Sequence, residues 1–233
     1  YAPGRGGTHA ENLYAGIREG AVLMSDGYEV YNGIAHSHGL IHLGCWAHAR
    51  RYFVEAEAVL PKAVRRPDQL ATQFIAAIAR LYAVEAKVKG KGVAERAQLR
   101  EASSRSILAE IQQLLVTHRH SVTPGSLLGK ALHYLEAQWP KLIRYVENGA
   151  WPIDNNLCEN AIRPFVVGRR NWLFSDTVAG ANASANIYSL IETCKANGVD
   201  TYRYLVALFK ALPLAKTADD YEQLLPWHLT LGD

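Results

Sequence analysis

Two acidic residues that are far apart in the sequence stand in settings where carboxylates do chemistry. Asp26 directly follows a short apolar run, Ala21–Ser25. Open α/β sheets place their ligand chemistry at the carboxyl ends of such buried strands. Glu159 lies in the segment Asp154–Pro164, which is dense in asparagine, acid and arginine. Carboxylate oxygens suit Mg²⁺, an ion that stabilises the oxygens of a phosphodiester during cleavage, so the pair indicates metal-dependent phosphodiester chemistry.

Each acid also has a purely structural explanation. Asp26 precedes a glycine, and Asp-Gly is a common turn pair. Glu159 and Arg163 are four residues apart, so they would form an ion pair on a helix surface. Two carboxylates are also few for two-metal catalysis. The residues by themselves leave both roles open for each acid.

The segment around Glu159 forms a polar stripe. Asn155, Glu159 and Arg163 recur every four residues, so a helix would carry all three on one face. Asn156 stands beside them, and we expect both asparagines to support the site. Arg163 would then be a phosphate-binding neighbour of the acid.

Four further arginines and one tryptophan are candidates for contact with nucleic acid. Arg169 and Arg170 precede Trp172, and Arg50 and Arg51 are adjacent. Arginine binds phosphate through two parallel hydrogen bonds, and an unpaired base can stack on tryptophan. A structural tryptophan beneath a solvated basic turn explains the first group equally well, and simple solvent exposure explains the second.

Cys45 and His48 have the spacing of half a zinc site. No second pair with metal-ligand spacing accompanies them, so the sequence does not favour zinc. A buried cysteine and a histidine bonded near the active site account for the pair better.

Two short strands and a helix position Asp26 and this pair. The apolar runs Ala21–Ser25 and Leu40–Gly44 predict strands, and the interval between them suits a compact crossover between parallel neighbours. A helix from Cys45 to about Leu60 follows. Between Lys62 and Gly149 three apolar stripes at helical spacing predict a helical region, in which Pro140 marks a break.

The last part of the chain is expected to mix helix and strand. Asp154 would cap a helix that ends at Pro164, with Leu157 and Ile162 facing a core. Short strands are then predicted at Phe165–Val167 and Asn171–Phe174. Later helices are predicted at Ala179–Ala196, after the cap Asp200, and at Tyr221–Leu225. The whole chain reads as an α/β protein that is mostly helical.

Composition sets wide limits. Of the 233 residues 49% are hydrophobic and 20% are charged, and the net charge of +3 permits nucleic-acid binding without demanding it. Three widely spaced cysteines do not form a disulfide framework, which fits a reducing cytoplasm. No apolar run approaches the roughly 20 residues of a membrane helix, so no membrane partner is expected.

Five segments in chain order resemble the transposases of the insertion sequence 66 family. They are Asp26–Tyr31, Gly44–Arg51, Asp154–Pro164, Gly168–Phe174 and Tyr188–Gly198. The resemblance implies an RNase H-like core of the DDE class, with a large helical insertion before the final acid. It implies Asp26 as the second acid, Glu159 as the third, and Mg²⁺ or Mn²⁺ as cofactor. The implied activity is cleavage and joining of DNA at transposon ends in a bacterial cytoplasm.

The chain departs from the family pattern at its beginning. No residue before Asp26 matches the first catalytic aspartate, so we expect a C-terminal portion of a transposase that is inactive alone. We expect residues 1–60 and 151–213 to form parts of the core, 61–150 the insertion and 214–233 a tail. A non-catalytic DNA-binding or assembly module derived from a transposase stays open as the alternative, as does a homo-oligomer.

Overall fold

The structure is a computed structural model that describes residues 6–61, 65–172 and 175–229. It divides into two compact units, an N-terminal unit ending at Leu157 and a C-terminal unit starting at Cys158. The described part of the chain is mostly helical with one small parallel sheet, which confirms the predicted α/β, mostly helical class.

The sheet of the N-terminal unit has two strands, β1 (Val22–Ser25) and β2 (Ile41–Gly44). They pair in parallel with Ser25 opposite Gly44, as the sequence predicted. Helix α2 (Val30–Ser37) makes the crossover between them, and α1 (Gly7–Leu13) precedes β1. A small core holds these elements together through the side chains of Leu23, Ile34, Ala35 and Leu40. Both strands therefore end at the same edge of the sheet.

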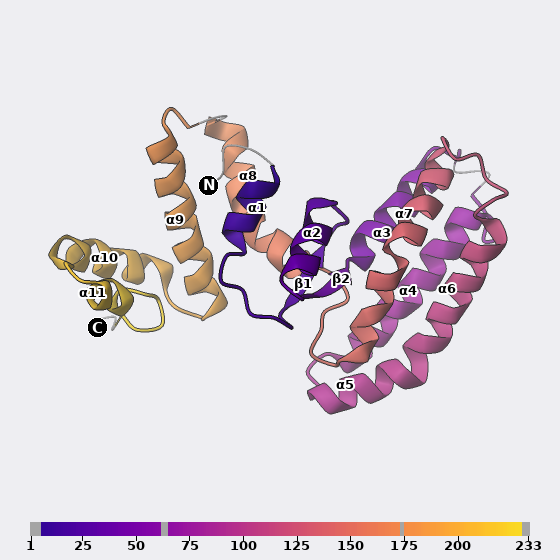
Figure 1. Cartoon of the computed structure of the whole chain (residues 1–233), viewed down its shortest axis with the longest axis horizontal. Coiled ribbons are helices and arrows are strands. Elements are labelled where there is room, and N and C mark those ends of the chain that lie inside the picture. The colour runs from indigo at the N-terminus through magenta and orange to yellow at the C-terminus, as the bar shows by residue number, and fades with distance from the viewer. Residues whose placement is uncertain (1–5, 62–64, 173–174, 230–233) are drawn as a thin grey trace. The chain divides into compact units, whose positions relative to one another are not determined.

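A helical bundle makes up the rest of the N-terminal unit. Helices α3 (Trp46–Ala58), α4 (Leu70–Val88), α6 (Arg105–His118) and α7 (Leu127–Leu142) run side by side, with the short α5 (Val93–Leu99) at one end (Figure 1). The bundle buries a large apolar core that includes Trp46, Phe53, Phe74, Ile78, Ile111, Leu132, Leu135 and Leu142. Because α3 leaves β2 directly, its first turn joins the sheet to this core: the indole N–H of Trp46 donates to the carbonyl of Leu142 at 2.9 Å.

The C-terminal unit contains four helices among its described residues. They are α8 (Asn156–Trp172), whose first residues belong to the N-terminal unit, α9 (Val178–Ala196), α10 (Thr201–Ala211) and α11 (Ala218–Gln223). Asp200 caps α10 as predicted, since its carboxylate accepts the amide of Arg203 at 2.8 Å. The last helices pack against one another through a small core of Cys194, Tyr204, Leu208 and Leu224.

Both proline boundaries were wrong. Pro164 lies inside α8, and Pro140 lies inside α7. A proline removes one helix hydrogen bond and crowds the carbonyl four residues earlier, but the rest of each helix outweighs that local cost. The strand at Phe165–Val167 was wrong for the same reason, because those residues continue α8. Of the strand expected at Asn171–Phe174, the first two residues also belong to α8 and the last two lie outside the described residues.

The expected inner face of α8 was wrong as well. Leu157 is 87% exposed and Ile162 is 53% exposed, so neither side chain faces a core. The helix instead contacts α9 through Phe165, whose ring meets the ring of Tyr188 edge-on with centroids 5.2 Å apart. Among the described residues, no helix has both the length and the apolar character needed to cross a bilayer.

Candidate active site

The common edge of the two strands carries the first candidate acid and the cysteine. Asp26 follows Ser25 at the end of β1, and Cys45 follows Gly44 at the end of β2. The parallel register aligns these two ends, so the sheet brings the Asp26 turn and the start of α3 to one side. That is the edge at which open α/β sheets place ligands.

The turn at Asp26 is held from both ends and leaves its carboxylate accessible. Oδ1 of Asp26 accepts the amide of Tyr28 at 3.2 Å, and the side chain is exposed. The carbonyl of Asp26 accepts the hydroxyl of Tyr134, on α7, at 2.7 Å. Gly27 has a φ of 98°, and a Cβ there would lie 3.0 Å from Nε2 of Gln138. A glycine is therefore needed after the acid, and α7 fixes the backbone of the turn.

A buried pair of side chains lies behind this turn. Ser25 and His42 share a hydrogen bond of 2.8 Å between Oγ and Nε2, and the amide of Gly27 donates to the same Oγ at 3.4 Å. Burial, and to a lesser extent the charges of Lys141 and Arg144, lower the pKa of His42 to about 4. The imidazole is therefore neutral at pH 7, which keeps the pair compatible with its buried position.

Cys45 joins the sheet edge to the segment that leads into α8. Its thiol donates to Oδ1 of Asn155 at 3.0 Å, and burial raises its pKa, so the sulfur stays protonated near pH 7. His48 is half-buried one turn further along α3. Among the described residues, no group of three or more His, Cys, Asp or Glu side chains gathers in a way that could hold a metal ion.

Asp154 fixes the same segment against the bundle. Its Oδ2 accepts the hydroxyl of Tyr82, on α4, at 2.8 Å, and its Oδ1 accepts the amide of Asn156 at 3.1 Å. Asp154 thus satisfies the amide of the first residue of α8, but it lies one position before the N-cap that it was predicted to be. Arg50, Tyr82 and Asn156 line a neighbouring cavity of about 410 Å³. Tyr82 was not predicted as part of the site, because it lies within an ordinary amphipathic helix.

Glu159 and the C-terminal arginines all lie on α8. Glu159 is half-buried in the first turns of this helix, while Arg163, Arg169 and Arg170 are exposed along it. Trp172 ends the helix, but its side chain lies outside the described residues. Asp26 belongs to the N-terminal unit and Glu159 to the C-terminal unit. Arg50 and Arg51 are exposed on α3 in the N-terminal unit.

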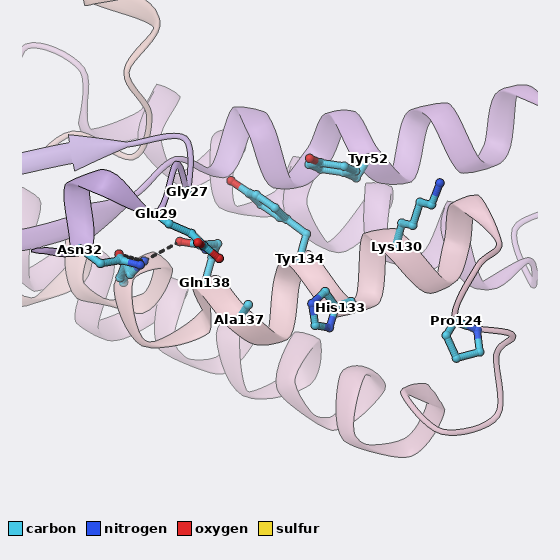
Figure 2. A pocket seen from close by; sticks show the side chains of 11 residues that line it. Gly27, Glu29, Asn32, Tyr52, Pro124, Lys130, His133, Tyr134, Ala137 and Gln138 are labelled. Carbon is cyan, nitrogen blue, oxygen red and sulfur yellow. Dashed lines mark hydrogen bonds between the residues drawn. The ribbon is translucent and has the colours of Figure 1, made fainter. Parts of the chain in front are cut away.

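A groove of about 700 Å³ opens beside the Asp26 turn, between α2, α3 and α7 (Figure 2). The rings of Tyr52 and Tyr134 stack within it, with centroids 4.5 Å apart and planes at 28°. These tyrosines and the groove lysines were not predicted from the sequence. The signal was the spacing of Lys130, Tyr134, Gln138 and Lys141 at i, i+4, i+8 and i+11, which places them in one stripe along an amphipathic helix.

Comparison with known families gives two matches. Residues 1–183 match the family described as Transposase IS66 family, and residues 189–227 match the IS66 C-terminal element. Three uncharacterized proteins of Sinorhizobium fredii (strain NBRC 101917 / NGR234) are similar over nearly the whole chain. Protein y4qI is 32% identical over 98% of the chain and 42% of its own length. Protein y4jD is 27% identical over 98% of the chain and 44% of its own length.

The third of these proteins, y4hP, is 29% identical over 96% of the chain and 42% of its own length. The chain therefore spans less than half the length of the curated relatives that it matches. No solved structure matches the chain.

Proposed function

The chain belongs to the IS66 family of transposases, and on that premise we propose that it supplies two catalytic acids for metal-dependent cleavage and joining of transposon DNA. Family membership gives a function in transposition and an interaction with DNA. The proposal adds the chemistry: in-line attack on a phosphodiester, first by water and then by a freed 3′-hydroxyl. The DNA partners would be the transposon ends and the target.

The main observation in support of the proposal is that Asp26 has an exposed carboxylate on a backbone held in place by hydrogen bonds. Its carboxylate is exposed at the carboxyl edge of a parallel sheet, while its backbone is held by Tyr134 and its own side chain. A carboxylate that is accessible on a fixed backbone is preorganised for a ligand. Its oxygens fit Mg²⁺ or Mn²⁺, which would stabilise the attacking and leaving oxygens when bound.

Glu159 is proposed as the second ligand on this chain. It lies three residues after Asn156, which corresponds to about 4.5 Å along a helix axis. The segment just before it is fixed to the sheet edge through Cys45–Asn155 and to the bundle through Tyr82–Asp154. These bonds support the proposal because they anchor the start of the helix that carries the acid.

The arginines of α8 are proposed to bind the DNA backbone. Arg163, Arg169 and Arg170 are exposed along this helix. Planar guanidinium groups bind phosphate oxygens in pairs of parallel hydrogen bonds. We assign residues 61–150 to a helical insertion between the two acids, in line with the bundle that they build.

We also propose that the 233 residues do not complete the catalytic acid set. Among the described residues before Asp26, the acids are Glu11 in α1 and Glu19 in a turn, and neither follows a strand. A further carboxylate from a longer protein would complete the metal site. The 233-residue chain should therefore leave transposon-end DNA uncut in Mg²⁺ or Mn²⁺.

The test is strand cleavage by a full-length transposase that contains these residues. Glu159→Gln and Asp26→Asn should each lower the cleavage rate at least about 100-fold, because each removes a metal-binding carboxylate while keeping side-chain size. Glu222→Gln and Asp219→Asn, at exposed acids of α11, are the matched controls and should cut at the normal rate. Normal cleavage by Glu159→Gln or Asp26→Asn would contradict the catalytic assignment.

A second function is a non-catalytic DNA-binding or assembly module. It is favoured by the lack of any three-residue metal-binding group among the described residues. The same experiment separates the two functions, because such a module would leave the full-length protein without metal-dependent cleavage at all.

A further inference from the structure

The groove beside Asp26 has a polar stripe along one of its walls. Lys130, Tyr134, Gln138 and Lys141 line it from a single face of α7. From the first to the last of these residues α7 rises about 16 Å. The stripe is thus long enough to contact more than one nucleotide of a strand.

Two aromatic rings lie in the middle of the stripe. Tyr52 comes from α3 and Tyr134 from α7, and Figure 2 shows the two side chains next to each other between these helices. The hydroxyl of Tyr134 is used by the Asp26 carbonyl, which keeps that ring in place. Tyr52 remains 37% exposed, so part of a pre-stacked ring is open to a ligand.

Positive charge is available at the far end of the groove. Lys130 is exposed, and no carboxylate among the described residues pairs with it. Lys141 is instead held by Oδ1 of Asn32 at 2.8 Å and Oε1 of Gln138 at 2.9 Å. Glu29 adds a negative charge at the end near Asp26. A bound anion should therefore lie nearest to Lys130.

We propose that this groove binds an unpaired DNA strand, with one base stacked on Tyr52 and a phosphate on Lys130. Surfaces that bind single strands combine a cationic track with aromatic rings, because every base has a face that can stack. The placement of the groove next to a strand-cleavage centre rests on the proposed function, whereas the binding itself does not. Duplex DNA would keep its bases stacked on one another and would gain only the phosphate contact.

The test is direct binding of fluorescent oligo(dT) of 12 nucleotides to the 233-residue chain in EDTA. Tyr52→Leu should weaken binding at least about fivefold through the lost stacking. Lys130→Gln should weaken binding about threefold and make its salt dependence shallower, since one phosphate contact is lost. A 12-base-pair duplex should be affected by Lys130→Gln but not by Tyr52→Leu.

Matched controls come from exposed residues outside the groove. Tyr202→Leu, on α10, and Lys87→Gln, on α4, should each change oligo(dT) binding less than twofold. Circular dichroism should show that all four variants are folded. Because Lys130 is exposed, its variant keeps the test valid even if Tyr52→Leu disturbs α3.

Groove binding is overturned if the wild-type chain binds no oligo(dT), or if both groove variants bind it as their controls do. That result does not contradict the assignment of Asp26 and Glu159, because the cleavage assay tests those two acids independently of DNA binding in the groove. Conversely, normal cleavage by Asp26→Asn and Glu159→Gln would remove the proposed function, while weaker oligo(dT) binding by the groove variants would keep the groove.

Discussion

The imidazole of His42 is the titrating group that couples the Asp26 turn to pH. It is buried against Ser25, and its pKa of about 4 lies below the ordinary value of 6.5. Between these two values the unfolded chain binds more protons than the folded chain. Folding stability should therefore fall as the pH drops from about 6.5 towards 4, by at most about 3 kcal/mol from this group.

Replacing His42 isolates its contribution to the pH dependence of folding stability. His42→Gln keeps a hydrogen-bonding group near Ser25 but cannot titrate, so its free energy of unfolding should decline less between pH 7 and pH 4.5 than that of the wild type. His36→Gln, on an exposed position of α2, should keep the wild-type decline. Urea unfolding at the two pH values measures this, and equal losses in His42→Gln and the wild type would refute the role of the imidazole.

For single residues, the sequence predicted the position of Asp26 but not the residues that hold it in place. An apolar run followed by Asp-Gly predicted that Asp26 follows a strand, and the structure has Asp26 directly after β1. The hydroxyl of Tyr134, which fixes the turn, comes from 108 positions away in the chain. No local pattern encodes such a contact, because it depends on how α7 packs against the sheet.

Arg100 is the main polar link inside the helical bundle. Its guanidinium is fully buried and donates to Glu85 at 2.8 and 2.7 Å, and to the carbonyls of Tyr145 and Asn148 at 2.9 Å each. It lies in a π-helical turn, Arg100–Ser104, between α5 and α6. The arginine thereby joins α4, this turn and the segment that leads towards α8.

Removing that charge should destabilise the N-terminal unit strongly. Arg100→Met should lower the free energy of unfolding by about 3–5 kcal/mol, because it leaves Glu85 buried without its partner. Arg105→Met breaks an ion pair with Glu101 whose side chains are 55% and 61% exposed, so it should cost less than about 1 kcal/mol. Urea unfolding compares the two, and equal costs would contradict the structural role of Arg100.

Helix α8 shows what sequence patterns miss at the scale of elements. The short parallel sheet and the later helices follow from apolar periodicity, so they were predicted close to their observed bounds. Pro164 and the β-branched residues after it favoured a strand locally, but a strand needs a partner to complete its hydrogen bonds. A helix completes nearly all of its bonds internally, so the chain continues as α8 through Pro164.

The two units divide the proposed catalytic residues between them. Asp26 lies in the unit with the sheet and the bundle, whereas Glu159 and the phosphate-binding arginines lie in the unit that begins at Cys158. The family resemblance, carried by five ordered segments, predicted the membership that the comparisons confirm, whereas the catalytic roles of the two acids stay predictions. The central proposal is that each of the two acids is a metal ligand of the transposase.

The most direct test is the binding of Mn²⁺ to a full-length transposase that contains these residues, followed by electron paramagnetic resonance. Asp26→Asn and Glu159→Gln should each weaken Mn²⁺ binding at least about tenfold, or about 1.4 kcal/mol. Normal Mn²⁺ binding by either single variant would contradict the assignment of that acid as a metal ligand.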